Sequence, residues 1–153
     1  MKKLFLAILA VFLMLVIPTA AFSARVTQSE IEDVTFNAVT TTAYSDVVDI
    51  QGYDKVGFFV KYDETEVGLS ISAVITIEIS YDGTNYVASN FYDFAGLLVA
   101  QTSETISTDS WYHMWLNSDI GSPYAEYVRV KVVATNTDAD DLLDINIYMI
   151  TKE

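Results

Sequence analysis

The segment from Ser70 to Asp82 alternates almost strictly between apolar and polar residues, and only Val74 interrupts the polar row. The apolar row consists of Ile71, Ala73, Ile75, Ile77, Ile79 and Tyr81. A period of two is typical of a strand with one face in a core and the other in solvent. The pattern therefore predicts a β-strand in a sheet that is covered on one side.

Three further segments repeat this alternation and predict three more long strands. Their inward rows are Val56, Phe58, Val60 and Tyr62; Val128, Val130, Val132 and Ala134; and Leu143, Ile145, Ile147 and Met149. Weaker strands are expected at Val34–Val39, Val47–Ile50, Tyr86–Tyr92, Leu97–Ile106 and Trp111–Leu116. Turn residues separate these segments, and Gly83 within Asp82–Asn85 is suited to a hairpin. We predict one all-β domain, an antiparallel β-sandwich of jelly-roll or Ig-like type with eight to nine strands.

The first residues of the chain have the layout of a secretory signal peptide. Lys2 and Lys3 precede an uncharged run, Leu4–Ile17, and Pro18 is followed by small residues. This order of positive start, apolar middle and small-residue exit predicts a helical signal peptide at residues 1–23 and a β-sandwich domain at 24–153. The alternative is an uncleaved anchor, because 21 residues without charge can cross a bilayer. Either way we expect a secreted, cell-surface or periplasmic domain.

The net charge and the absence of cysteine limit which partners the protein can bind and which reactions it can catalyse. Residues 24–153 contain all 21 acidic residues against six of the eight basic ones, a net charge of −15. Such a surface repels nucleic acid and anionic lipid, so we expect no nucleic-acid partner and no membrane contact after removal of the leader. The chain contains no cysteine, which excludes disulfides, thiol catalysis and thiolate metal sites.

Groups for catalysis are scarce. His113 is the only histidine, so no histidine cluster can hold a metal, and it lies within an expected strand. Nothing in the spacing of the 21 acidic residues picks out a carboxylate pair for glycoside hydrolysis. We therefore predict that the protein is not an enzyme and has no cofactor.

Trp111, His113 and Trp115 occupy alternate positions, so they share one face of their strand. If they lie outward, the two indoles form a ligand-binding surface that can stack on sugar rings. The opposite arrangement places both tryptophans in the core and Tyr112 outside. The sequence favours this second arrangement, because tryptophan is highly buried on average.

A second candidate site is the turn Asn136–Asp141, where oxygen ligands recur as they do at the start of a calcium loop. The candidate ligands are Asn136, Asp138, Asp140 and Asp141. The EF-hand pattern then fails, because its sixth position is Asp141 and its twelfth is Ile147. The sequence thus indicates weak Ca²⁺ binding at most, and a solvated acidic turn is the alternative.

Several expected strands are apolar on both faces, which a strand on the surface of a two-layer sandwich should not be. These positions are Phe58–Val60, Leu97–Val99, Val132–Val133 and Leu142–Leu143. Either the chain covers them itself or a partner subunit does. For self-association the candidates are Phe59 and the apolar row Val34, Phe36 and Ala38, which could add as a strand to a neighbour's open edge. The alternative is that this row pairs within its own domain.

Three segments together resemble the small β-sandwich proteins of bacteriophage virions, head decoration and tail-associated modules especially. They are Ile50–Val56, the hairpin Ser80–Tyr86, and Tyr127–Val130. The resemblance extends over about 100 residues from Val47 onward. It implies a non-enzymatic structural domain that docks on a protein lattice or on copies of itself. The leader departs from that family, because virion proteins assemble in the cytoplasm.

These observations predict an exported structural or adhesive subunit that self-associates or decorates a surface or extracellular assembly. The alternative is a secreted carbohydrate-binding module that uses Trp111 and Trp115.

Overall fold

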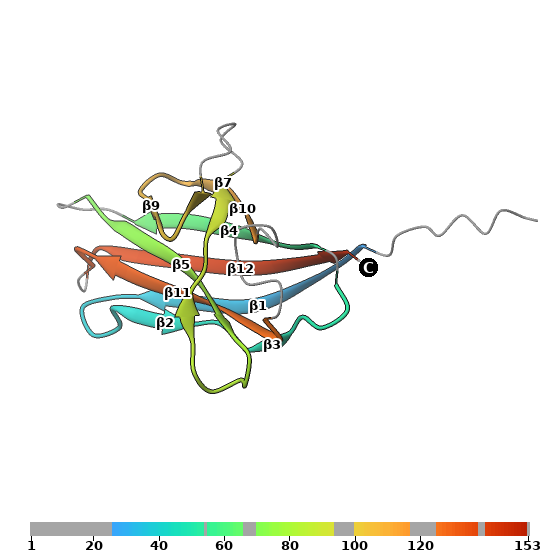
Figure 1. Cartoon of the computed structure of the whole chain (residues 1–153). Helices are drawn as coiled ribbons and strands as arrows, with labels where there is room; N and C mark the ends of the chain where they lie inside the picture. The colour runs from blue at the N-terminus through green and yellow to red at the C-terminus, as the bar shows by residue number, and fades with distance from the viewer. Residues whose placement is uncertain are drawn as a thin grey trace, which may run out of the picture.

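The structure is a computed structural model that describes residues 26–53, 55–65, 70–93, 100–116, 125–137 and 140–152. Within these ranges the chain forms strands and no helix, and the strands build two antiparallel sheets in two layers (Figure 1). The predicted all-β antiparallel sandwich is therefore confirmed.

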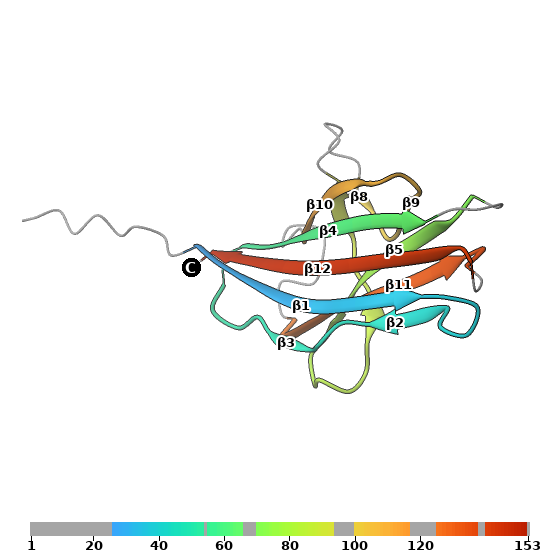
Figure 2. The same ribbon diagram turned by 180° about the vertical axis from the view of Figure 1, so that it is seen from behind.

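The two sheets are named here after their long inner strands. The β12 sheet contains, in order, β1 (Val26–Phe36), β12 (Leu142–Lys152), β4 (Lys55–Thr65), β10 (Ser110–Leu116), β7 (Phe91–Asp93) and β8 (Ala100–Gln101). The β11 sheet contains β2 (Thr42–Tyr44), β11 (Tyr127–Thr135), β5 (Ser72–Ser80) and β6 (Val87–Ala88), with β3 (Val48–Asp49) paired to β11 and β9 (Glu104–Ile106) paired to β5. The first and last strands, β1 and β12, lie side by side (Figure 2).

The described ranges contain twelve strands, more than the eight or nine expected. The surplus comes from elements of two or three residues, such as β7 and β8, which lie where one longer strand or none was expected. Such short strands bury too few residues to leave a periodic signal in the sequence.

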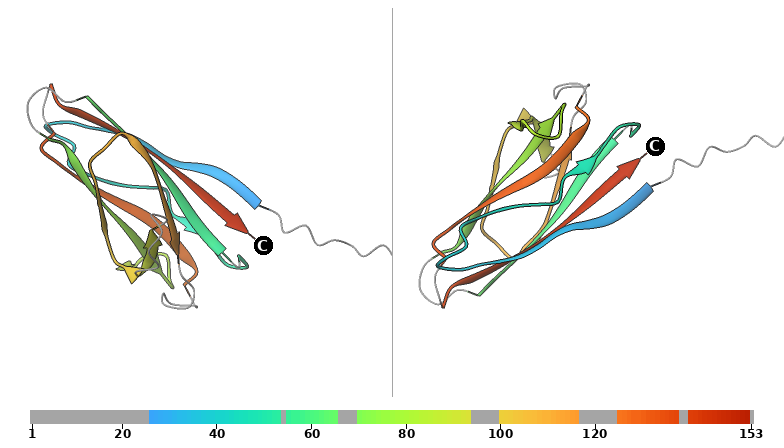
Figure 3. Two further views of the ribbon diagram at one scale, coloured as in Figure 1. Left: turned by 90° about the horizontal axis from the view of Figure 1, so that it is seen from above. Right: turned by 90° about the horizontal axis from the view of Figure 1, so that it is seen from below.

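The core lies between the two sheets, and the four long alternating strands supply most of it (Figure 3). Apart from Tyr81, every residue of the four predicted inward rows is at most 5% exposed. Burial of each Val, Leu, Ile, Phe or Met side chain in these rows stabilises the fold by about 1.5–3 kcal/mol. The inner face of each long strand was therefore predictable from its period alone.

Tyr81 is the exception, because it is 50% exposed rather than inward. β5 ends at Ser80, which is buried, and its backbone carbonyl accepts a hydrogen bond from the Glu126 amide. The expected hairpin follows at once: Gly83 has φ of 69°, and the Asp82 carboxylate accepts hydrogen bonds from the amides of Thr84 and Asn85. β5 thus ends two residues before Asp82, where the alternation in the sequence ends.

The expected signal peptide at residues 1–23 and the expected apolar segment Leu97–Val99 lie outside the described residues. In the part of the chain that the structure describes, no helix is long and apolar enough to cross a membrane. The division at residue 23 therefore remains a prediction.

Candidate functional site

β10 presents its two rows to opposite sides of the β12 sheet. Met114 is fully buried opposite Phe58, whereas Trp111 is 50% exposed opposite Lys61. The expectation that the tryptophans fill the core is wrong, and the row Trp111, His113, Trp115 faces outward. Both rows of this strand are apolar, so the alternation alone could not decide between them. The pairing of β10 with β4 decides it, because Met114 lies beside a residue of the inner row.

The outward row of β10 meets aromatic side chains of β4, its neighbour, and of β12, the next strand beyond β4. The rings of Phe59 and His113 meet edge-on with their centroids 4.1 Å apart. The Trp111 and Tyr148 rings are 5.7 Å apart and tilted by 43°. Tyr148 also lies opposite Phe59 in the pairing of β12 with β4. We call these residues and Trp115 the outer aromatic band: Phe59, Trp111, His113, Trp115 and Tyr148.

Trp115 is seated on Gly57 of β4. A methyl group at Gly57 would lie 2.6 Å from Cε3 of the indole, closer than real contacts allow. Glycine in a strand interior often marks such a close approach, here of a ring to the backbone. The six-membered ring of the Trp115 indole therefore lies against the backbone of β4 at Gly57, while Trp111 at the other end of β10 remains half exposed.

A shallow pocket of about 280 Å³ adjoins Trp111, lined by Lys61, Tyr62, Asp63, Asp109, Ser110 and Trp111. Lys61 Nζ lies 3.0 Å from Asp63 Oδ2, and this hydrogen bond raises the pKa of Lys61 above its ordinary value. Asp109 Oδ1 accepts a hydrogen bond of 2.8 Å from the Glu64 amide, which ties the start of β10 to β4. The pocket thus combines a half-exposed indole with charged groups that are already held in place.

Tyr62 lies at the base of this pocket and is almost fully buried. Its hydroxyl donates to a Glu64 carboxylate oxygen and lies 3.0 Å from the Ile71 carbonyl oxygen. Burial first, and then the Glu64 carboxylate, raise the pKa of Tyr62 well above its ordinary value of 10.0. The hydroxyl thus links β4 to Glu64 on the same strand and to Ile71, the residue before β5.

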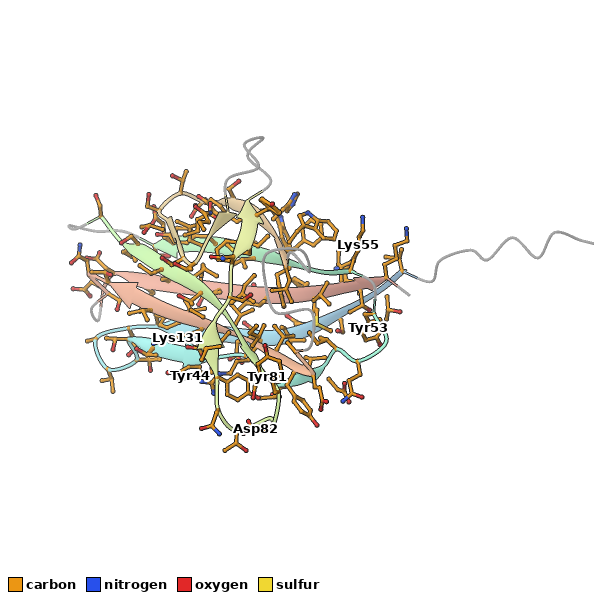
Figure 4. All side chains as sticks on the ribbon, viewed as in Figure 1. Tyr44, Tyr53, Lys55, Tyr81, Asp82 and Lys131 are labelled. Atoms are coloured by element: carbon orange, nitrogen blue, oxygen red, sulfur yellow. The ribbon has the colours of Figure 1, made fainter. Side chains whose placement is uncertain are left out.

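The outer face of the β11 sheet is built around Arg129. Its Nη2 and Nε lie 2.6 and 2.8 Å from Oε2 of Glu78 on the paired strand β5. The guanidinium also lies between two rings, 4.3 Å from the centroid of Tyr44 and 3.9 Å from that of Tyr86. Tyr44 lies beside Lys131, with Tyr81 and Asp82 on the nearby hairpin (Figure 4). On this face the aromatic rings thus stack on Arg129, and Arg129 forms an ion pair with Glu78.

The predicted calcium loop is only partly described. Asn136 has φ of 63° and donates from Nδ2 to the Ser70 carbonyl oxygen at 2.9 Å. Asp140 is exposed, Asp141 is 2% exposed, and Asp138 lies outside the described residues. Among the described residues no three carboxylate, histidine or cysteine side chains form a group that could hold a metal ion. Calcium binding at this turn remains a prediction.

The residues expected to mediate self-association lie in different settings. Val34 and Phe36 belong to β1 and pair with Ile145 and Leu143 of β12, and Phe36 is fully buried in its own core. The alternative of pairing within the domain is the arrangement in this structure. Ala38 is exposed in the loop after β1, and Phe59 belongs to the outer aromatic band.

Two features escaped the sequence analysis. The pocket beside Trp111 joins β4 to the turn before β10, and the Arg129 stack joins three segments that are distant in sequence. Neither feature leaves a motif in the sequence, because its residues come together only when the strands pair. The one available signal was the position of Arg129 and Glu78 in the polar rows of two predicted strands.

Comparisons with known proteins give a fold and no family. No family model and no curated protein sequence matches the chain. Among solved structures, it is similar to the SPBc2 prophage-derived protein YomS, with a TM-score of 0.58 at 11% identity over 85% of this chain and 95% of that one. A weaker likeness, with a TM-score of 0.37 at 14% identity, is to a structure described as Bacillus endospore appendages that form disulfide-linked pili. It covers 87% of this chain and 93% of that one. The resemblance to phage-derived β-sandwich proteins is thus confirmed at the level of the fold.

Proposed function

We propose that this protein is an exported, non-enzymatic subunit of a surface or extracellular assembly, and that it docks on other protein subunits through the outer face of its β12 sheet. The observation that carries the proposal is the outer aromatic band, in which rings from β10, β4 and β12 meet on a face that in a free sandwich is polar. Contiguous apolar side chains of this kind mark contact surfaces on soluble domains.

The chemistry of the pocket beside Trp111 agrees with a role without catalysis. Asp63 is held by Lys61, and Asp109 is held by the Glu64 amide. Each carboxylate therefore already has a structural partner, whereas a general acid or base needs a group that is poised to exchange its proton with substrate. The fold shared with a prophage-derived protein supports the same role, and the pattern of residues 1–23 supports export.

Electron microscopy and sedimentation of the purified chain test the proposal. The double variant Trp111→Ala/Tyr148→Ala removes two rings of the band. Tyr81→Ala is the matched control, because Tyr81 is as exposed as Trp111 but lies on the hairpin that follows β5 of the other sheet. We expect ordered assemblies from the wild type and the control, and their loss in the double variant. Assemblies that are unchanged in the double variant would contradict the proposed face.

A second candidate function, glycan binding, rests on Trp111 alone. Its indole is 50% exposed and borders a pocket with a lysine and two aspartates, which can supply hydrogen bonds to sugar hydroxyls while the ring stacks on the sugar face. Fluorescence titration with cellohexaose and with a chitin hexamer tests it. We expect a saturable change in the wild type that Trp111→Ala removes. No change with either sugar removes these sugars as ligands, and an equal change in the variant removes Trp111 as their binding site.

A further inference from the structure

β1 forms one margin of the β12 sheet, and its two halves differ in how their free edge is protected. Its inner side pairs with β12 from Val26 to Phe36 (Figure 2). No other described strand pairs with its outer side. An unpaired strand edge presents amide and carbonyl groups that can pair with another chain, so natural edges carry charges, bulges or covering segments.

The second half of β1 carries all three of these protections. The pairing with β12 shifts between Glu30 and Glu32, which makes a bulge at Ile31. The outward carbonyl of Ile31 accepts a hydrogen bond of 3.0 Å from the Asp46 amide, so another segment covers it. Partial burial, then Asp46 and Asp33, raise the pKa of Glu32, which shows how closely acidic groups gather at this part of the edge.

Among the described residues, the first half of β1 has no bulge and no covering strand, and it has only one charge. Every residue from Val26 to Glu30 is exposed, and the register with β12 is regular throughout. The segment contains no proline and no lysine, and Glu30 is its single charge. That charge is directed back at its own sheet, because Asn146 Nδ2 of β12 approaches Glu30 Oε1 at 3.5 Å.

We infer that this half of the edge pairs with the same segment of a second copy of the chain. The inference rests on the proposed function and names the partner within it. The pair is antiparallel about a two-fold axis at Gln28, which places each Gln28 opposite the other and each Val26 opposite Glu30 of the second copy. No like charges face one another in this register, whereas pairing through the second half would bring Glu32 and Asp33 together.

The two-fold axis stands perpendicular to the sheets, so both outer aromatic bands face the same side of one continuous sheet. An isologous contact of this kind closes on itself and yields a dimer rather than a fibre. Five residues of strand bury less than the roughly 1,200–2,000 Å² of a stable interface, so the pair is weak alone. It gains strength where copies are held at high local concentration in an assembly.

Disulfide trapping tests the pairing directly, because the chain has no cysteine of its own. In an antiparallel pair, facing Cα atoms lie about 4.5–5.5 Å apart, within the range that a disulfide spans. We expect Gln28→Cys to form covalent dimers at least about tenfold faster than Val39→Cys, because pre-paired thiols react at a raised effective concentration. Val39 is the control, since it is 90% exposed and lies beyond the end of β1. Equal rates for the two variants would overturn the inference.

A charge variant completes the test. Gln28→Lys places two lysines opposite each other, and charged side chains at a strand edge prevent pairing in natural proteins. Val39→Lys is the control. Sedimentation over a concentration series should show a dimer that Gln28→Lys abolishes and Val39→Lys retains. Trp111→Ala should leave trapping at Gln28 unchanged, because Trp111 lies on β10, which is separated from β1 by β12 and β4. If Gln28→Lys does not change the dimer, Gln28→Cys is not trapped faster than its control, and Trp111→Ala/Tyr148→Ala abolishes assembly, then the edge pairing is wrong and the docking face stands. If Gln28→Lys abolishes the dimer, Gln28→Cys is trapped faster, and Trp111→Ala/Tyr148→Ala leaves assembly unchanged, then the docking face is wrong and the edge pairing stands.

Discussion

The outer face of the β12 sheet and the outer face of the β11 sheet both carry aromatic side chains, but the contacts around those rings differ. On the β11 sheet, Tyr44 and Tyr86 enclose the Arg129 guanidinium, whose charge Glu78 neutralises. On the β12 sheet the rings meet mainly one another, and the nearby ion pair Lys61–Asp63 lies in solvent, with 40% and 53% of these side chains exposed.

The difference shows which aromatic residues stabilise the fold and which are available to a partner. The Arg129 and Glu78 side chains are 25% and 14% exposed, so little of this ion pair remains for another molecule, although Tyr44 beside it is 44% exposed. Trp111, by contrast, is held on one side by Tyr148 and is open on the other. Aromatic content alone therefore does not identify a docking face; what matters is whether the rings hold a charged group of the domain between them, as Tyr44 and Tyr86 hold Arg129.

The largest loss of stability is expected from a substitution that breaks the cluster of Arg129, Glu78, Tyr44 and Tyr86 on the β11 sheet. Arg129→Leu leaves Glu78 partly buried without its cation, and we expect a loss of about 2–3 kcal/mol in the free energy of unfolding, below the value for a fully buried pair. Lys61→Leu removes the cation of the exposed pair on the other sheet and should cost less than about 1 kcal/mol. Urea unfolding measures both, and equal losses would contradict the comparison.

The next effect concerns the contact of Trp115 with the backbone. Gly57→Ala forces the indole away from β4, and overpacking of this kind costs about 1–3 kcal/mol. In the Trp115→Leu background the same change should cost much less, because the ring that blocks the methyl group is gone. A double-mutant cycle by urea unfolding measures the coupling. Additive losses would show that Trp115 does not rest on Gly57.

A smaller effect comes from the hairpin that carries Tyr86 to Arg129. Hydrogen bonds from the Asn85 and Thr84 amides, and then from the Asn85 and Ser80 side chains, lower the pKa of Asp82 below its ordinary value of 3.8. A lowered folded-state pKa gives stability that is present above the unfolded value and is lost as the pH falls through the folded one. The melting temperature of the wild type should therefore fall more below pH 3.8 than that of Asp82→Asn. Parallel curves would exclude this contribution of Asp82.

The smallest change in stability is expected from a substitution on the proposed docking face. Trp111→Ala should change the free energy of unfolding by less than about 0.5 kcal/mol, because a half-exposed residue contributes little to the core. Tyr44→Ala on the other face should cost clearly more, since it removes one ring from Arg129. Thermal unfolding of the two variants measures the contrast. A large loss from Trp111→Ala would assign the outer aromatic band to the fold rather than to a partner.

Sequence reasoning succeeded where only one row of a strand is apolar. In β5, β11 and β12 the inward rows followed from the period, and only Tyr81 at a strand end was misplaced. It was wrong at β10, where Trp111, His113 and Trp115 alternate with an equally apolar row. There the general tendency of tryptophan to be buried favoured the wrong face, and Met114 fills the core instead.

By itself, the sequence determined that the chain is a β-sandwich and which rows of its long strands form the core, because a period of two encodes the face of a strand locally. The tertiary structure decided which row of β10 lies outside and that Arg129 stacks between Tyr44 and Tyr86. It also decided that no other described strand pairs with the outer edge of the first half of β1. These depend on strand order and register, which join residues far apart in the chain. No local pattern records such pairings.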